Sequence, residues 1–462
     1  MAKPDSNGGG DGGPQAYSRR HIWVVFVSLL LDLLSFTMIL PLLPSLLDYY
    51  ESHDTSGAYP LVVSRVREFG AAIGAPDRFT PVLLGGLLGS LFSLLQFLTA
   101  PVSGRLSDVY GRRPVLLLSL VGIAASYVLW YRASSFLVFV AARVAGGLSK
   151  GNVNLSSAIV TDVTDVESRG RGMAWLGVAF SVGFIVGPIM GAAFAAGFGR
   201  GGGGGATLYQ APAMLAIALS SLNVLFVYLA LPESLPAERR RRRAGTDDSL
   251  LDYISPAALL KFRLVRCADA TQQAALRHIG LVYFLYLFIF SGVEFTLTFH
   301  CHTRFAYTSM QQGYMFLYMG ALMAVVQGGY VRRIPEQRME RTALVGVGLL
   351  LPSFVAVALS YSQLGLYAGF TLYALSTAVC VPCLSTIAAR YGGAHQKGAV
   401  TGVFRSLGAL ARALGPVLFS TVFWLTGATV CYCAAAVVMI VPLMLLARFR
   451  PPSTAATAAK DD

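Results

Sequence analysis

Long apolar runs alternate with short polar stretches along nearly the whole of this 462-residue chain. A run of about 20 apolar residues crosses the roughly 30 Å hydrocarbon core of a bilayer as a helix. Helices also satisfy the backbone hydrogen bonds that lipid cannot satisfy. The runs predict helical spans near residues 21–46, 81–103, 114–131, 136–161, 172–196, 208–231, 278–300, 311–331, 342–360, 364–389, 399–425 and 429–448. The pattern therefore predicts an all-α membrane protein with twelve transmembrane helices.

A long polar stretch over residues 232–277 separates the sixth span from the seventh and contains an unbroken run of arginines from Arg239 to Arg243. This interruption predicts two bundles of six helices each joined by a solvated segment. The predicted domains are a disordered cytoplasmic N-terminus (1–20), an N-terminal bundle (21–231), a cytoplasmic linker (232–277), a C-terminal bundle (278–449) and a cytoplasmic tail (450–462).

Charge narrows the class of protein further. Only 13% of the residues are charged, about half of the quarter that is typical of soluble domains, which excludes a disordered chain and an ordinary soluble enzyme. The net charge of +13 would suit a nucleic-acid partner, but membrane proteins also gather Lys and Arg on their cytoplasmic loops. When successive loops are assigned to alternate sides of the membrane, most of the 36 Lys and Arg residues fall on the same side as the termini and the linker. We therefore expect cytoplasmic termini, a lipid bilayer around the chain and no nucleic acid.

The connection between the second and third spans carries the strongest local motif. It reads Gly-Arg-Leu-Ser-Asp-Val-Tyr-Gly-Arg-Arg-Pro from Gly104 to Pro114. Its glycines permit a tight turn, and Asp108 either lies at a helix N-terminus or pairs with the arginines that follow. This motif resembles the signature loop of the major facilitator superfamily, whose fold is two six-helix bundles. The resemblance implies that Gly104, Asp108, Gly111, Arg112 and Arg113 act in gating, so that changes here alter turnover more than substrate choice.

The fifth span contains Gly183, Gly187 and Gly191 four residues apart, with Pro188 beside the second. Small residues at this spacing let two helices approach closely, and proline bends a helix. The pattern resembles the antiporter motif of the drug:proton antiporter branch, which gives Gly183, Gly187 and Pro188 a gating role. Simple close packing explains the glycines equally well.

Ionisable side chains inside predicted spans form the third signal. A charge at the bilayer centre costs a few kcal/mol, so its function is the first hypothesis. These residues are Asp32, Glu294, Arg143, Lys150, Arg405 and Arg412. Arg143, Lys150 and Asn154 lie at helical spacing and are predicted to share one face. Structural pairs between helices are the alternative, most of all for Arg405 and Gln96.

These residues suggest a proton-coupled mechanism. Asp32 or Glu294 would be protonated in one facing state, and a nearby cation, Arg143 or Lys150, would shift its pKa between states. Because cations outnumber carboxylates, we expect an anionic substrate held by Lys150 and Arg412, with aromatic faces around its apolar body. The predicted substrate-binding residues are Lys150, Arg412, Arg405, Asn154, Gln96, Tyr283 and Tyr286.

The resemblance to tetracycline:proton antiporters runs from about Trp23 to Ala447, and Asp32 with Pro41 matches their first helix in spacing. Four stretches, at 32–44, 145–153, 280–288 and 405–413, are more similar to vertebrate tetracycline-transporter-like carriers. That resemblance implies transport of organic anions. The third span carries Ser126 near the position where bacterial exporters have an Asp, so tetracycline itself is not the expected substrate.

The sequence thus predicts a secondary transporter that exchanges protons for amphipathic organic anions and acts as a monomer. A proton-independent facilitator, a symporter, an organic-cation carrier and a non-transporting scaffold or receptor remain as alternatives. No cofactor or metal is expected, because the sequence His300-Cys301-His302 has no carboxylate or second pair of ligands nearby and favours an ordinary loop. No sorting signal selects among the plasma membrane, the lysosome and the nuclear envelope.

Overall fold

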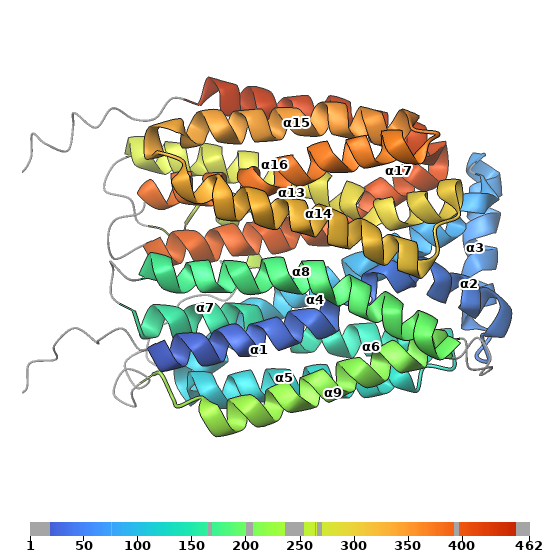
Figure 1. Ribbon diagram of the computed structural model, residues 1–462, viewed down its shortest axis with the longest axis horizontal. Helices are drawn as coiled ribbons and strands as arrows, with labels where there is room; N and C mark the ends of the chain where they lie inside the picture. The colour runs from blue at the N-terminus through green and yellow to red at the C-terminus, as the bar shows by residue number, and fades with distance from the viewer. Residues whose placement is uncertain are drawn as a thin grey trace, which may run out of the picture.

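The chain folds into a bundle of long helices that run roughly side by side, with one helix lying across an end (Figure 1). The computed structural model describes residues 19–74, 76–164, 169–199, 207–235, 254–263, 265, 270–391 and 397–449. Every regular element in that part of the chain is an α- or 3-10 helix. The predicted disordered N-terminus, most of the predicted linker and the predicted tail lie outside the described residues.

The first half of the chain supplies the elements up to residue 235. They are α1 (Arg19–Thr37), η1 (Leu40–Leu42), α2 (Leu43–His53), α3 (Ala58–Ile73), η2 (Asp77–Phe79), α4 (Thr80–Tyr110), α5 (Arg112–Tyr131), α6 (Phe136–Ser149), α7 (Asn152–Asp162), α8 (Arg169–Gly199) and α9 (Thr207–Ala230).

The second half continues with a short helix in the connecting segment and then long helices. They are α12 (Pro256–Leu260), α13 (Ala270–Phe305), α14 (Ser309–Gly329), η3 (Val331–Arg333), η4 (Glu336–Arg338), α15 (Met339–Leu359), α16 (Gln363–Arg390) and α17 (Lys397–Arg448). Because α13 begins at Ala270, the seventh span starts earlier than the predicted boundary at 278, and the predicted linker ends in helix.

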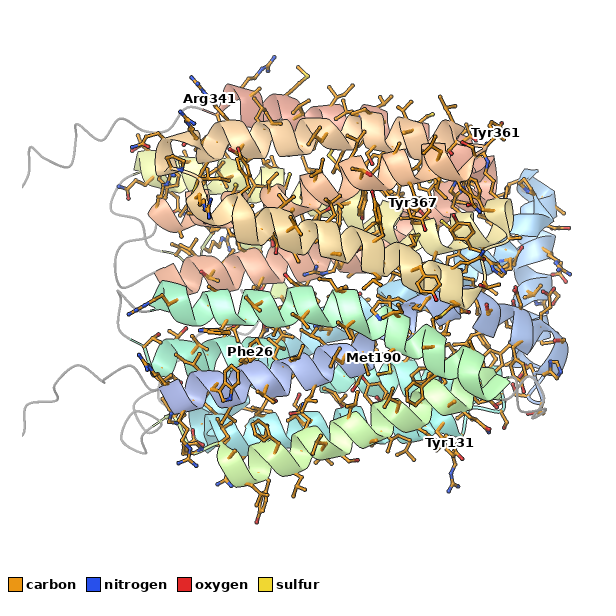
Figure 2. The ribbon with its side chains drawn as sticks, viewed as in Figure 1. Phe26, Tyr131, Met190, Arg341, Tyr361 and Tyr367 are labelled. Atoms are coloured by element: carbon orange, nitrogen blue, oxygen red, sulfur yellow. The ribbon has the colours of Figure 1, made fainter. Side chains whose placement is uncertain are left out.

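Nine stretches of the described chain are long and apolar enough to cross a membrane. One of them, Val400–Arg448, contains the eleventh and twelfth predicted spans. Their boundary is Gly427, whose φ of 82° interrupts the helix, as the predicted break between 425 and 429 requires. The fourth predicted span falls on α6 and α7, and the eighth falls on α14. Figure 2 shows α15 crossing the molecule, with Arg341 labelled near its start and Tyr361 labelled just beyond its end.

The two ends of the bundle differ. We call the end at which α1 begins and α17 finishes the terminus end, and the opposite one the α3 end, because α3 lies across it (Figure 1). The ring of Tyr59 on α3 stacks edge-on against Phe136 of the N-terminal half, 5.1 Å between centroids. Phe69 on the same helix lies parallel to Trp424 of α17 at 6.4 Å. The α3 helix therefore touches both halves of the chain.

Within each half, helices pack in pairs: α1 with α8 and α5 with α9 in the first, α13 with α17 and α15 with α16 in the second. Between the halves, α4 packs against α17 and α8 against α14. Small residues allow this approach, since a Cβ on Gly89 would overlap the Phe295 ring and one on Gly313 would lie 3.0 Å from Ala192. These contacts join the halves in the part of the molecule near the α3 end.

At the terminus end, Gly104 of α4 and Gly402 of α17 face open space, with no neighbouring atom within 4 Å of a Cβ built on either. The structure corrects the prediction of a loop from Gly104 onward, because α4 continues through Tyr110 and the turn is confined to Gly111. Gly111 has a φ of 105°, a region that side chains with a Cβ rarely adopt. One glycine rather than two is therefore required for the turn.

Candidate functional site

A buried ion pair between Asp32 and Lys150 forms the centre of the N-terminal half. The Lys150 ammonium lies 2.8 Å from one Asp32 carboxylate oxygen and 2.7 Å from the other. The two residues are 2% and 4% exposed. Lys150 also lies 4.6 Å from the centroid of the Phe36 ring, one turn after Asp32 on α1. A cation with both oxygens of a carboxylate and an aromatic face beside it is well compensated at this depth.

Lys150 lies at a break in the fourth span, which corrects the prediction of one continuous helix over 136–161. Helix α6 ends at Ser149, Lys150 has φ −80° and ψ 53°, and α7 begins at Asn152. The Ser119 hydroxyl on α5 donates to the Ser149 carbonyl and accepts from the Gly151 N–H. Because the break separates Arg143 from Asn154, these residues do not share the single helical face that was predicted.

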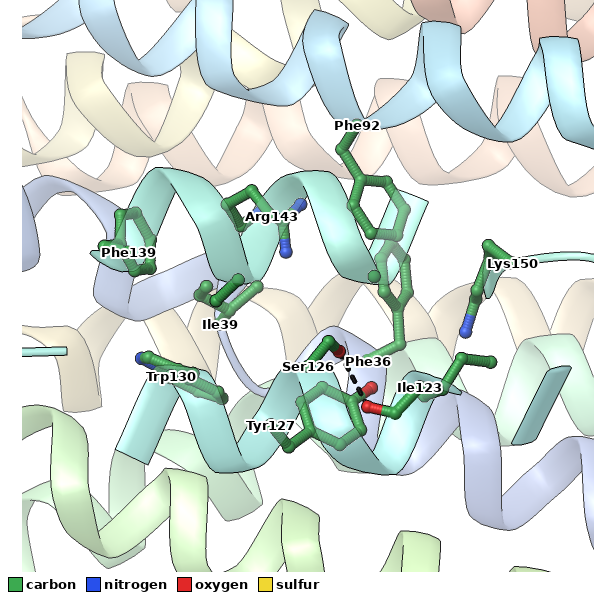
Figure 3. A pocket seen from close by; sticks show the side chains of 12 residues that line it. Phe36, Ile39, Phe92, Ile123, Ser126, Tyr127, Trp130, Phe139, Arg143 and Lys150 are labelled. Carbon is green, nitrogen blue, oxygen red and sulfur yellow. Dashed lines mark hydrogen bonds between the residues drawn. The ribbon is translucent and has the colours of Figure 1, made fainter. Parts of the chain in front are cut away.

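Arg143 lies beside a small cavity enclosed by α1, α4, α5 and α6 (Figure 3). Its guanidinium carbon lies 4.2 Å from the centroid of the Phe92 ring. Figure 3 shows Phe36 and Phe92 between Arg143 and Lys150. The cavity measures about 20 Å³, which suffices for a water molecule but is far below the roughly 300 Å³ of a drug-sized site. In this conformation the cavity can hydrate Arg143 and Lys150 but cannot hold an organic substrate.

The C-terminal half holds a second polar cluster. Glu294 on α13 interacts electrostatically with Arg412 on α17. A Cβ built on Gly408 would lie 3.3 Å from the Tyr283 hydroxyl and 3.6 Å from the Arg412 guanidinium. No ion pair of Glu294 or Arg412 is found in the part of the chain that the structure describes. These two charges thus share one region of the bundle without neutralising each other directly.

Arg405 connects the two clusters. Its guanidinium donates to the Val153 carbonyl at 3.3 Å, from α17 to α7. Val153 lies three residues after Lys150, so a cation of the C-terminal half reaches the helix break of the N-terminal half. The structure thereby brings Arg405 and Lys150 into one region of the molecule.

Other predicted substrate-binding residues differ in accessibility. Gln96 on α4 and Asn154 on α7 are half-buried. Tyr286 is fully buried and stacks on Phe290 at 5.7 Å, which places it in the packed interior of the C-terminal half. Sequence reasoning missed Phe36 and Phe92, the rings that face Lys150 and Arg143. Phe36 follows Asp32 by one helical turn, a signal that could have identified it.

The predicted gating residues form a network at the terminus end. Arg112 lies 2.8 Å from Asp108 and 2.8 Å from Asp162, the last residue of α7. The carboxylate of Glu233 accepts the backbone N–H groups of Arg112 at 2.9 Å and Arg113 at 3.1 Å. Asp108 therefore pairs with an arginine, one of the two predicted arrangements, and Glu233 completes the first turn of α5. Sequence reasoning did not include Asp162 or Glu233.

The glycines of the fifth span pack against α1. A Cβ on Gly183 would lie 2.5 Å from the Leu33 Cβ, and one on Gly187 would overlap the Thr37 hydroxyl. Thr37 donates to the Gly183 carbonyl at 2.9 Å. The helix that carries Asp32 is thus held directly against the helix that carries Pro188, which agrees with the close-packing interpretation of this motif.

The fold and these motifs define a class of protein. The sequence profile of the Major Facilitator Superfamily matches residues 25–416, and the chain belongs to this superfamily. It is a multipass integral membrane protein of the secondary-transporter class and not an enzyme.

Individual relatives agree over nearly the full length. Major facilitator superfamily domain-containing protein 10 of Bos taurus is 45% identical over 450 residues, which cover 95% of each chain. The crystal structure of the human organic anion transporter MFSD10 (TETRAN) is 44% identical, covers 93% of this chain and 99% of its own, and superposes with a TM-score of 0.77. The class B tetracycline resistance protein of Escherichia coli is 26% identical over 401 residues, covering 87% of this chain and 88% of its own.

Proposed function

We propose that this transporter carries amphipathic organic anions by alternating access and couples their movement to protons through Asp32. The observation that carries the proposal is the buried Asp32–Lys150 pair, with both oxygens within 2.8 Å of the ammonium. The name of the solved 44% identical relative, an organic anion transporter, supports the substrate class. We expect one chain to suffice, because both polar clusters come from the same polypeptide.

Charge favours an anion. Asp32 and Lys150 compensate each other. Among the described residues, the other charged groups singled out inside the predicted spans are the guanidinium groups of Arg143, Arg405 and Arg412 and the carboxylate of Glu294. Arg405 reaches across to α7, and Arg143 has an aromatic ring rather than a carboxylate beside it. A bound carboxylate would reduce the excess of positive charge, whereas a bound cation would increase it. The neighbouring Phe and Tyr faces suit an apolar substrate body.

The ion pair provides the coupling. A proton on Asp32 removes the counter-ion of Lys150 and leaves a buried charge uncompensated, which costs several kcal/mol. The carboxylate of an entering anion can take the place of Asp32. Proton and anion then favour each other's binding by the same factor, because coupling between two ligands is reciprocal. This arrangement favours movement of proton and anion in the same direction.

Exchange of protons for anions is the second candidate. It is favoured by the Gly183, Gly187 and Pro188 pattern, which packs α8 against the helix that carries Asp32. Exchange requires that a proton and an anion exclude each other. It would result if the anion bound only at Arg405 and Arg412 while Asp32 remained ionised.

Flux into liposomes with an imposed pH gradient tests the proposal. Purified protein is reconstituted, and uptake of labelled aryl carboxylates is followed together with internal pH. We expect an inward proton gradient to accelerate uptake and Asp32→Asn to abolish this acceleration. Acceleration by an outward gradient would establish exchange instead, and uptake indifferent to both gradients would refute proton coupling. Transport of organic cations but not of anions would refute the substrate class.

The orientation in the membrane has a separate test. We propose that the termini lie in the cytoplasm, because the basic residues gather on their side of the chain. In intact cells, a cysteine-directed impermeant label should then reach a cysteine introduced in α3 but not one introduced beside Arg112. The reverse pattern of labelling would overturn this orientation.

A further inference from the structure

The α3 end of the molecule has its own interaction between the two halves. The Nε2 atom of His302, near the end of α13, lies 2.8 Å from a carboxylate oxygen of Asp48 on α2. The residues are 254 positions apart. The sequence favoured an ordinary loop over a metal site for His302 and its neighbours His300 and Cys301, but His302 lies within α13. Its ring joins the N-terminal to the C-terminal half.

The second ring nitrogen of His302 also faces an acceptor. Nδ1 lies 3.2 Å from the backbone carbonyl oxygen of Tyr307. A neutral imidazole has one N–H donor, whereas the imidazolium has two. Only the protonated ring can therefore donate to both Asp48 and Tyr307 at once. The two acceptors, at 2.8 and 3.2 Å from the two ring nitrogens, suit the imidazolium form.

The surroundings of the ring leave Asp48 as its charged partner. Among the described residues, Asp48 is the charged group that interacts with the His302 ring. On α2, Glu51 pairs with Arg67 instead, at 3.4 Å. On α13, the Arg304 guanidinium donates to the Ala358 carbonyl and lies over the Tyr361 ring. Tyr307 lies in the turn after α13 and Tyr367 lies on α16, and their phenol groups interact with each other.

Solvent can reach this pair. The side chains of His302 and Asp48 are 29% and 50% exposed, so a proton can enter from the solution at the α3 end without crossing the bundle. The pair lies away from Asp32 and Lys150, which are almost fully buried between other helices. It is therefore a separate titratable site.

We propose that His302 and Asp48 form a second proton-binding site, which holds the α3 end closed when it is occupied. Opening this end separates α2 from α13 and breaks the contact with Asp48, so the open form binds the proton more weakly. By linkage, a proton taken from the solution at this end favours closure. Closure is greatest below the pKa of His302 and declines as the pH rises through it. The inference rests on the alternating access proposed above, but not on the anion or on Asp32.

Disulfide trapping tests the site without a substrate. The hydroxyl oxygens of Ser45 on α2 and Ser309 on α14 lie 3.2 Å apart and join the two halves at the same end of the molecule, so Ser45→Cys with Ser309→Cys places two thiols within reach. The rate of disulfide formation is measured at about pH 5.5, 6.5 and 7.5 and divided by the rate in the same background with His302→Gln. Thiol ionisation is common to both proteins and cancels in this ratio.

We expect this ratio of rates to decrease by about threefold to tenfold from the lowest pH to the highest, because one pK unit corresponds to about tenfold in an equilibrium. With His302→Lys, which keeps a charge at every pH, the ratio should stay high throughout. With Asp48→Asn the pH dependence should disappear. His53→Gln is the matched control, because the contacts of His53 within the described part of the chain are with Ser52 and Tyr49 of its own helix, and it should behave as the unmodified protein.

A ratio that does not change with pH would overturn the proposal, as would a pH dependence that persists in Asp48→Asn. If His302→Gln fails to fold, the rate of disulfide formation in His302→Lys is compared with the rate in the protein that retains His302, which supplies the same test. Because no anion is present, a failure of proton-coupled anion transport leaves this result unaffected. A flat ratio with intact coupled transport would likewise refute only the second proton site.

Discussion

The Lys150 ammonium contacts both carboxylate oxygens of Asp32, at 2.7 and 2.8 Å, although the two residues are 118 positions apart. Asp32 lies on α1 and Lys150 lies at the break between α6 and α7, and neither is more than 4% exposed. Removing one partner of such a buried pair is costly, and a single proton on the Asp32 carboxylate is enough to neutralise the counter-ion of Lys150. The pair therefore connects the stability of this half to its proposed chemistry.

Neutralising one partner should destabilise the protein far more than neutralising both. Asp32→Asn leaves the Lys150 charge buried and uncompensated, and we expect a loss of about 3–5 kcal/mol. Asp32→Asn combined with Lys150→Gln removes the stranded charge and should recover most of that loss. Thermal unfolding of the purified proteins measures the difference. A double variant no more stable than Asp32→Asn would contradict the account of this pair.

The contact between α8 and α1 should tolerate no added side chain at Gly187. Gly187→Ala places a Cβ onto the Thr37 hydroxyl and 2.9 Å from the Leu34 carbonyl oxygen, and overpacking of this kind costs about 1–3 kcal/mol. Gly177→Ala on the same helix is the control, since no neighbouring atom lies within 4 Å of its Cβ. Unfolding temperatures should fall for the first variant only. Equal behaviour of the two variants would show that the helices do not approach as described.

Loss of the Arg112 network should affect turnover and leave substrate affinity unchanged. Arg112→Gln breaks the contacts with Asp108 and Asp162, which hold α4 and α7 together at the terminus end. We expect the maximal transport rate to fall by about tenfold or more, equivalent to roughly 1.4 kcal/mol, with KM unchanged. Initial rates over a range of anion concentrations provide both constants. Arg112→Lys retains the charge but not the fork of donors and should be intermediate; a raised KM at an unaltered rate would argue against gating.

Asp54, after α2, should make stability at the α3 end depend on pH. Burial opposes its ionisation, but hydrogen bonds from the Tyr59 and Phe136 N–H groups and from Ser56 outweigh this and hold the pKa of Asp54 below its usual 3.8. A carboxylate with a lowered pKa stabilises the fold above its unfolded pKa, and the contribution disappears as the pH falls through the folded value.

Asp54→Asn should therefore lower the unfolding temperature at about pH 6, and the difference from the unmodified protein should shrink below about pH 3.8. The control is Asp77→Asn, because Asp77 lies exposed at the same end and should show little effect at either pH. A difference for Asp54→Asn that persists unchanged at the lowest pH would show that its ionisation is not responsible.

The sequence predicted the fold in most of its detail because lipid imposes a simple constraint on apolar runs. The division of α17 at Gly427 is an example, since the polar pattern and glycine both mark it. The break at Lys150 was missed for a physical reason. It depends on the Ser119 hydroxyl of another helix, and no signal within residues 136–161 reveals that partner.

The candidate site was predicted as a set of residues but not as an arrangement. Buried charges are costly enough to attract notice individually, which identified Asp32, Lys150 and Glu294. The pairing of Asp32 with Lys150 depends on how α1, α6 and α7 lie against one another, and the residues near either position in the sequence do not reveal that packing. Pairing Lys150 with Asp32 changes the expected coupling, because an anion can then use Lys150 only after Asp32 is neutralised.

Proton uptake on anion binding tests the central claim most directly. Purified, weakly buffered protein is mixed with an aryl carboxylate that it transports, and a pH indicator reports the protons bound. Co-binding at Asp32 and Lys150 predicts the uptake of up to about one proton per bound anion. The uptake should be absent in Asp32→Asn and retained in His302→Gln. Release of protons on binding, or saturable binding with no change in bound protons, would contradict the account.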